Sequence, residues 1–322
     1  MKKLIGLAAA GAVILGLTGC SSAASGGSSG STDTVVGFSQ VGAESGWRTA
    51  NTISIQQSFK DAKIPLKFSD AQGKQENQIK AIRSYIQQKV SAIAFSPVVE
   101  SGWDTVLKEA KDAKIPVILT DRAVDSKDTS LYVTFLGSDF IKEGESVGTW
   151  VKENFADQAT VNIAELQGTT GSAPANDRAK GFRNILGSDP KFTVVASQTG
   201  DFTRALGKQV MEAFLKSNPE INLVFAHNDD MGLGAIEAIE AAGKVPGKDI
   251  KIVTIDAVKD GMQALADGKI NFIAECSPLL GDQLVSIVKD TLAGKSVEPR
   301  IVTEETTFTQ EQAIKALPDR KY

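Results

Sequence analysis

Short apolar runs alternate with longer amphipathic stretches from Thr34 onward. Most of the runs are continuous segments of Val, Ile, Leu and Phe, as expected for parallel strands that are buried on both faces. They cover residues 34–39, 66–70, 92–97, 117–121, 161–167, 193–198, 223–229 and 252–256. Amphipathic stretches typical of helices lie between them, including residues 75–89, 103–113, 203–215 and 232–242. This repetition of strand and helix predicts an α/β fold built on parallel sheets.

The predicted strands end in polar side chains. Open parallel sheets bind ligands in the crevice beyond the carboxyl ends of their strands. Polar ends occur in both halves of the chain, which predicts two sheet domains that face each other across a cleft. The positions concerned are Glu44 to Arg48, Asp121, Arg122, Gln167, Asn228, Asp229 and Asp256.

A lipoprotein signal peptide is predicted over residues 1–19. Lys2 and Lys3 precede an apolar stretch, residues 4–17, that is too short for an ordinary membrane-spanning helix. The stretch leads directly to Cys20, whose thiol can carry a diacylglycerol anchor. The alternative is a plain secretory signal in which Cys20 is incidental. Residues 20–33, almost entirely Ser, Gly and Ala after the cysteine, are typical of a flexible tether.

Composition narrows the class of protein further. The body that follows the tether is about twice the usual domain size, so two domains are expected. The net charge of -4 and the absence of a basic run argue against a nucleic-acid partner. Beyond Cys20 the chain holds one cysteine, Cys276, so no disulfide within the mature chain is expected. The single histidine, His227, makes no metal site, and we predict neither a metal nor a cofactor.

Two kinds of side chain point to carbohydrate chemistry. Asp121 and Arg122 place an acceptor beside a planar fork of donors, which suits vicinal hydroxyls, although the pair could also bridge to surface neighbours. Trp47 and Phe202 could each lie against a sugar ring or pack as ordinary core. The residue types alone leave these alternatives open.

An enzyme is the second hypothesis. A glycoside hydrolase could in principle use four carboxylates as acid, nucleophile or base, namely Glu44, Asp121, Asp256 and Glu275. No spacing selects a pair among them, and carboxylates beside arginines stay ionised, which suits binding better than acid catalysis. Neither a Gly-x-Ser-x-Gly nucleophile motif nor a nucleotide-binding glycine loop is present. We therefore expect a binding protein that performs no catalysis.

Several ordered motifs resemble the periplasmic sugar-binding proteins of the type I, ribose-binding-like family, and within it the galactofuranose-binding members of ABC importers. They are the segment from Val36-Gly37-Phe38-Ser39-Gln40-Val41-Gly42 through Arg48, Lys74-Gln75-Glu76-Asn77-Gln78-Ile79-Lys80-Ala81, Glu165-Leu166-Gln167-Gly168, Gly200-Asp201-Phe202-Thr203-Arg204 and Ala226-His227-Asn228-Asp229-Asp230-Met231. The resemblance implies a clamp of two lobes joined by three crossovers, near residues 136–138, 275–278 and 304–306. The lobes would comprise 34–136 with 278–304, and 137–277 with 305–322.

The resemblance also implies a ligand and its contacts. One monosaccharide, expected to be galactofuranose, would lie between the lobes. The contacts carried over are Glu44, Ser45, Gly46, Trp47, Arg48, Asp121, Arg122, Arg178, Phe202, Asn228, Asp256 and Glu275. Cys276, beside Glu275, departs from the family's pattern and bears on the choice of sugar.

The resemblance implies a monomer outside the cytoplasm. The galactofuranose-binding relative is a free periplasmic protein, whereas Cys20 would anchor this one to the cell membrane, at the surface of a Gram-positive bacterium or in the periplasm. This protein would deliver sugar to an ABC permease and its ATPase subunits, and an anchor of this kind is expected in a Gram-positive bacterium. A sugar sensor that presents its ligand to a membrane receptor is the alternative. A lac-repressor-like transcription factor shares the clamp, but a signal peptide stands where its DNA-binding segment would be.

Overall fold

The computed structural model describes residues 34–322. The predicted signal peptide, the predicted tether and the predicted lipidation site Cys20 lie outside the described residues. Within the described part of the chain, none of the helices combines the length and the apolar character needed to span a bilayer.

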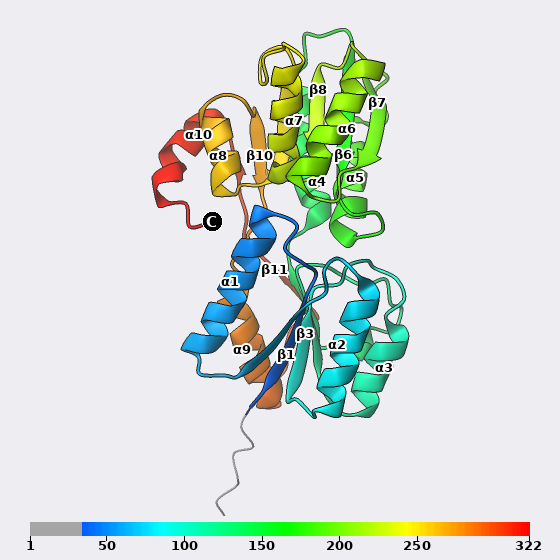
Figure 1. Cartoon of the computed structure of the whole chain (residues 1–322), viewed down its shortest axis with the longest axis vertical. Coiled ribbons are helices and arrows are strands. Elements are labelled where there is room, and N and C mark those ends of the chain that lie inside the picture. The colour runs from blue at the N-terminus through cyan, green and yellow to red at the C-terminus, as the bar shows by residue number, and fades with distance from the viewer. Residues whose placement is uncertain (1–33) are drawn as a thin grey trace, which may run out of the picture. The chain divides into compact units, whose positions relative to one another are not determined.

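Two six-stranded sheets form the framework (Figure 1). All strand pairs in the first sheet are parallel, in the order β11-β5-β4-β3-β1-β2. We call this sheet and its helices the first lobe. Its strands are β1 (Val36–Gln40), β2 (Leu66–Asp70), β3 (Ala92–Phe95), β4 (Val117–Thr120), β5 (Thr134–Gly137) and β11 (Arg300–Val302).

The second sheet runs in the order β12-β10-β9-β8-β6-β7, and it forms the second lobe with its own helices. Its pairs are parallel except that β12 runs antiparallel to β10. Its strands are β6 (Val161–Gln167), β7 (Phe192–Thr199), β8 (Leu223–Ala226), β9 (Lys251–Asp256), β10 (Phe272–Glu275) and β12 (Thr307–Phe308).

Helices cover both faces of each sheet. In the first lobe, α1 (Gly46–Asp61) and α9 (Gly281–Leu292) pack on one face, and α2 (Gln75–Gln87) and α3 (Asp104–Asp112) pack on the other. In the second lobe, one face carries α4 (Phe140–Asn154) and α5 (Ala173–Leu186). The opposite face carries α6 (Arg204–Ser217), α7 (Asp229–Ala241), α8 (Lys259–Ala266) and α10 (Gln310–Ala316). Short 3₁₀ turns lie at Thr129–Leu131 and Leu317–Asp319. The predicted fold class is confirmed.

The chain passes between the sheets three times. The passages follow β5, β10 and β11, where the sequence predicts crossovers. The lobe boundaries drawn from the sequence stay a prediction. The pattern of apolar runs did not identify β5, β10, β11 and β12 as strands.

One strand ends earlier than the pattern of apolar residues predicts, because the residues that follow it cap a helix. The predicted strand 223–229 ends at Ala226, because Asn228 adopts an extended conformation and caps α7. Its side-chain oxygen accepts a hydrogen bond from Met231 N over 3.0 Å. Ser45 caps α1 in the same way, accepting from Arg48 N over 3.1 Å. Both caps lie at the carboxyl ends of strands, so they also fix the first turns of helices that begin at the cleft.

Candidate ligand-binding site

A small cavity lies between the carboxyl ends of the two sheets. The space in it that atoms do not fill is 280 Å³, and part of this space is open to solvent. Both lobes contribute to its wall. The lining residues are Glu44, Ser45, Trp47, Arg48, Asp121, Arg122, Pro174, Arg178, Phe202, Asn228, Asp256 and Cys276. All the contacts expected from the sequence line the cavity except Gly46 and Glu275.

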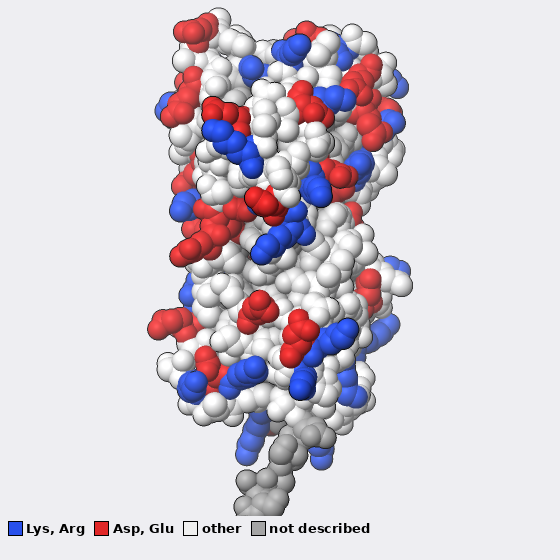
Figure 2. Space-filling model, turned by 90° about the vertical axis from the view of Figure 1, so that its left-hand side faces the viewer, with Lys and Arg blue, Asp and Glu red and all other residues white. Residues whose placement is uncertain are grey.

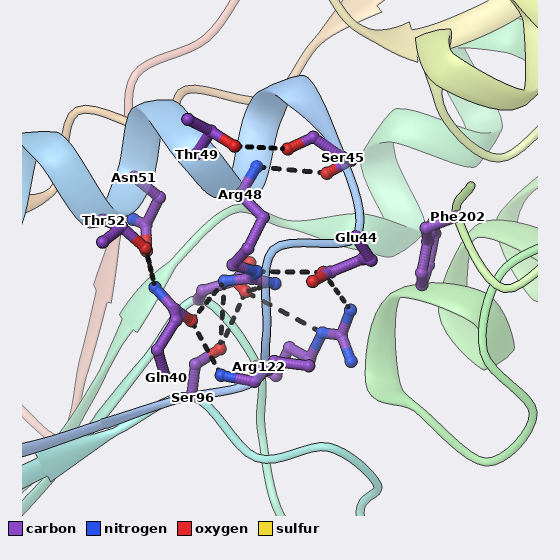
Figure 3. Close-up of polar contacts among 12 residues, drawn as sticks. Gln40, Glu44, Ser45, Arg48, Thr49, Asn51, Thr52, Ser96, Arg122 and Phe202 are labelled. Atoms are coloured by element: carbon purple, nitrogen blue, oxygen red, sulfur yellow. Dashed lines mark hydrogen bonds and ion pairs between the residues drawn. The ribbon is translucent and has the colours of Figure 1, made fainter. Parts of the chain in front are cut away.

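Arg48 organises the wall of the first lobe (Figure 3). Its guanidinium lies 2.6 Å from Asp121 Oδ2 and 3.0 Å from Glu44 Oε1. It also donates to Gln40 Oε1 over 3.1 Å and to Ser96 Oγ over 3.4 Å. Burial alone would lower the pKa of Arg48, but the two carboxylates outweigh it and raise that pKa above its ordinary value. Arg48 therefore stays charged and holds both carboxylates in fixed positions.

Arg122 is less completely paired. It donates to Val98 O over 3.1 Å, lies 3.5 Å from Glu44 Oε1, and places its guanidinium carbon 5.2 Å from the ring centre of Phe202. Burial, with the neighbouring charge of Arg48, lowers the pKa of Arg122 to about 10. Its Nε has no hydrogen-bond partner within the described residues. A donor of this kind, buried at the cavity wall, suits an oxygen atom of a bound molecule.

Glu44 presents a matching acceptor. Burial raises the pKa of this carboxyl, but the guanidinium groups of Arg48 and Arg122 outweigh that effect and leave it below its ordinary value. One oxygen of the resulting carboxylate is occupied by the arginines, whereas Oε2 is buried without a partner among residues 34–322. The alternative in which Asp121 and Arg122 bridge surface neighbours is wrong, because these side chains are only 5% and 3% exposed.

Arg178 organises the wall of the second lobe. It donates to Glu143 Oε2 over 2.7 Å and to His227 O over 2.6 Å, and lies 3.7 Å from Asp256 Oδ1. Its guanidinium carbon is also 6.0 Å from the ring centre of Phe202. The Phe202 ring therefore has an arginine from each lobe nearby, which fixes its position by cation–π attraction.

Asp256 ends β9 beside Arg178. Burial raises the pKa of this carboxyl well above its ordinary value, although the charge of Arg178 opposes the shift. Its φ of 127° and the φ of 66° at Ala257 are unusual for residues other than glycine. The backbone therefore takes an unusual course where Asp256 lines the cavity.

Trp47 packs in the core and also lines the cavity. Its side chain is 4% exposed and belongs to a core cluster made mainly of second-lobe residues, such as Phe140 and Ile163. Its Nε1 donates to Cys276 O over 2.7 Å, and part of its surface lines the cavity. A side chain of the first lobe is thus anchored in the second.

The two lobes contact each other directly at further points. Gly46, which does not line the cavity, donates from its backbone N–H to Asp230 Oδ2 over 2.8 Å. Elsewhere Glu100 N donates to Gly171 O over 2.9 Å, and Asn176 Nδ2 donates to Glu100 Oε2 over 2.5 Å. Asp230 was not among the predicted site residues, because its role depends on a partner 184 positions away in the sequence.

Glu275 lies at the crossover after β10 and does not line the cavity. Its carboxylate lies 2.7 Å from Arg320 Nη1 and accepts from the Tyr322 hydroxyl over 2.9 Å. The expectation that Glu275 contacts the ligand directly therefore has no geometric support. Pro174 and Cys276 also line the cavity. Of these two residues, only Cys276 was singled out from the sequence.

One group of side chains within residues 34–322 has the composition of a metal site. Glu143, Cys276 and Glu305 offer ligand atoms within 4.8 Å of one another. The positive Arg178 already binds Glu143, and burial raises the pKa of the Cys276 thiol, which favours the neutral form over the metal-binding thiolate. We assign no metal to this group.

The two lobes, their three passages and the cavity between them define a binding protein of the clamp type. The chain belongs to the periplasmic binding protein family, because residues 36–296 match the periplasmic binding protein domain. It is similar to the galactofuranose-binding protein YtfQ of Escherichia coli (strain K12), with 46% identity over 291 residues, 89% of this chain and 91% of that protein.

Two solved structures are similar to this chain in fold as well as in sequence. A Mycobacterium smegmatis protein in complex with β-D-fucofuranose is 62% identical, with a TM-score of 0.88 and coverage of 89% of this chain and 95% of that one. The binding protein of the arabinose ABC transporter from Shewanella sp. ANA-3, bound to α- and β-L-arabinofuranose, is 49% identical, with a TM-score of 0.86 and coverage of 89% and 96%. The resemblance found in the sequence is confirmed.

Proposed function

We propose that this protein captures a monosaccharide in its furanose form for an ABC importer and releases it unchanged. The observation that carries the proposal is the small cavity between the lobes, walled by paired arginines and carboxylates and by two aromatic rings. The proteins reported above are named for galactofuranose or bound to fucofuranose and arabinofuranose, which supports a five-membered ring. We expect galactofuranose or a close analogue.

The chemistry of the wall suits a sugar. Each hydroxyl both donates and accepts, so it can bridge a free carboxylate oxygen such as Glu44 Oε2 and a free donor such as Arg122 Nε. The rings of Phe202 and Trp47 offer apolar surface for the C–H side of the sugar. A cavity this small favours one sugar ring over an oligosaccharide.

Hinge closure follows from the way both lobes share the cavity. A sugar that contacts Arg48 on one lobe and Arg178 on the other binds the closed form better than the open form. Such differential affinity shifts the population toward closure. The bond from Gly46 to Asp230 would then form only when the lobes meet, which gives a permease a surface specific to the loaded protein.

Binding without catalysis is favoured by the pairing of the carboxylates. Glu44 and Asp121 are held by Arg48, and Glu275, one of the four candidates for hydrolysis, is engaged by Arg320 away from the cavity. A retaining or inverting hydrolase needs two carboxyl groups facing one glycosidic bond. The remaining candidate in the wall, Asp256, would have to act with Glu44 or Asp121, both of which Arg48 already holds.

Isothermal titration calorimetry provides the direct test. We expect heat from solutions of D-galactose, D-fucose or L-arabinose, whose furanose forms share one hydroxyl configuration. We expect little heat from glucose, ribose or xylose, whose hydroxyl configurations differ. Small-angle X-ray scattering should show a smaller radius of gyration with the bound sugar than without it. No heat from any of the six sugars would remove the sugar hypothesis, and turnover of a chromogenic furanoside would favour the enzyme.

The membrane anchor has a separate test. Replacing Cys20 with alanine removes the thiol that we propose to be lipidated, so the variant should leave the membrane fraction and appear in the medium or periplasm. Replacing Cys276 with alanine is the matched control, because this buried thiol lies in the folded body and should not affect fractionation. A Cys20→Ala protein that still sediments with membranes would contradict the anchor.

The proposed partners follow from the same role. We propose a monomer that docks on an ABC permease with ATPase subunits and binds no nucleic acid. On the face shown in Figure 2, acidic and basic side chains are interspersed and form no extended basic patch. Sugar uptake in a deletion strain separates transport, in which uptake falls, from a purely sensory role, in which uptake persists.

A further inference from the structure

We infer that Arg320 and Tyr322 form a clasp that sets the position of Asp256 and thereby the affinity for the sugar. The inference rests on the proposed function, because it counts Asp256 among the groups that contact the ligand. It gives a role to Glu275, which the sequence suggested as a ligand contact. It also gives a role to residues 317–322, which follow α10 and do not line the cavity.

Arg320 joins the two strand ends that lead into the site. Its Nε donates to the carbonyl oxygen of Ala257 over 2.7 Å, and its Nη1 donates to Glu275 Oε1 over 2.7 Å. The side chain is 10% exposed, and that of Glu275 is 14% exposed, so the pair is largely shielded from water. A shielded, charge-assisted pair of this kind holds its partners more firmly than an exposed one.

The segment that Arg320 holds, Asp256 and Ala257, has an unfavourable backbone conformation. Asp256 and Ala257 both have positive φ values, 127° and 66°, which residues with a side chain adopt only when their surroundings impose them. The carbonyl oxygen of Asp256 accepts from Cys276 N over 3.1 Å, and that of Ala257 accepts from Arg320. Without Arg320, one of these two restraints is lost and the segment can relax toward ordinary backbone angles.

Tyr322 completes the clasp. Its hydroxyl donates to Glu275 Oε1 over 2.9 Å, and the guanidinium carbon of Arg320 lies 4.1 Å from the centre of its ring. Its ring packs against the core cluster that contains Trp47 of the first lobe. Figure 1 shows this end of the chain beside α8 and near the start of α1. The clasp therefore connects Asp256, the crossover at Glu275 and the Trp47 cluster.

The experiment compares sugar affinity in matched variants of the full chain, with calorimetry and D-galactose as the probe. Arg320→Gln keeps much of the side chain but removes its charge, and we expect the dissociation constant to rise about 10-fold, as for loss of one charged hydrogen bond. Tyr322→Phe keeps the ring and should raise it about threefold. Lys321→Gln, an exposed change between the two, should leave it unaltered.

A double-mutant cycle separates positioning from general stability. Asp256→Asn alone should weaken binding, and adding Arg320→Gln to it should weaken binding no further, because the clasp acts through the Asp256 carboxyl. Additive losses would overturn the clasp, as would an Arg320→Gln protein that melts earlier but binds D-galactose normally.

The same cycle distinguishes the two proposals. If Asp256→Asn binds the sugar as the unaltered protein does, the proposed role of Asp256 in the site fails. If Asp256→Asn weakens binding while Arg320→Gln does not, only the clasp fails.

Discussion

Replacing Arg48 with methionine should abolish sugar binding and lower the free energy of unfolding by about 3 to 5 kcal/mol. Methionine fills much of the same volume but leaves Asp121 and Glu44 without the guanidinium that lies 2.6 and 3.0 Å from them. Both carboxylates would then be buried negative charges facing only Arg122, at 3.8 and 3.5 Å. Urea denaturation and titration calorimetry measure the two effects.

Arg83 provides the matched control. It forms two hydrogen bonds of 2.8 Å to Glu109, whereas Arg48 makes a single contact to each of its carboxylates, but the side chain of Arg83 is 48% exposed. Exposed pairs contribute about 1 kcal/mol or less, so Arg83→Met should have a small effect on unfolding and none on sugar binding. If the two variants were equally stable, burial would not be the reason for the importance of Arg48. If Arg48→Met bound sugar normally, the proposed wall of the first lobe would be wrong.

Replacing Gly168 with alanine should weaken sugar binding by about 100-fold, equivalent to roughly 2.7 kcal/mol. A Cβ atom at this position would lie 1.9 Å from Cζ of Phe202 and 2.3 Å from both Cε atoms. The ring is 3% exposed and lies near the guanidinium groups of Arg122 and Arg178, so the cavity is the main free space beside it. We expect it to be forced into the cavity or away from both arginines. Calorimetry with D-galactose measures the loss.

Two comparisons test this steric explanation. In a Phe202→Ala background the obstructing ring is gone, so adding Gly168→Ala should cause little further loss of affinity. Gly243→Ala is the control for introducing alanine at a glycine, because its φ of 74° makes alanine unfavourable while no atom lies within 4 Å of the new Cβ. It should reduce stability by about 1 kcal/mol and leave affinity unchanged. Equal losses from Gly168→Ala with and without Phe202 would show that the ring is not the cause.

Much of the architecture could be predicted from the order of residue types along the chain. Continuous apolar runs identify the long central strands, because a parallel strand covered by helices on both faces has no polar side. The polar residues that follow those runs mark the cavity wall for a similar reason. Parallel strands bring their carboxyl ends to one edge, so Asp121 and Asp256 are placed at the cleft by topology alone.

What remained undetermined depends on contacts between residues far apart in the sequence. The sequence placed Glu275 with the ligand contacts, whereas the tertiary structure turns it toward Arg320, 45 positions later. The sequence left Trp47 as either core or ligand face, and the structure packs it in the core of the other lobe while part of it lines the cavity. It did not single out Asp230, whose partner is the backbone of Gly46.

The sequence by itself determined the α/β class, two sheets with polar strand ends, and the residue types of a sugar site. Local patterns suffice for these features, because strand burial and helix capping depend on near neighbours. Only the tertiary structure decided which carboxylate each arginine binds, which candidates line the cavity and which support it from outside. Those outcomes depend on how two lobes, each assembled from separate segments of the chain, meet around one small space.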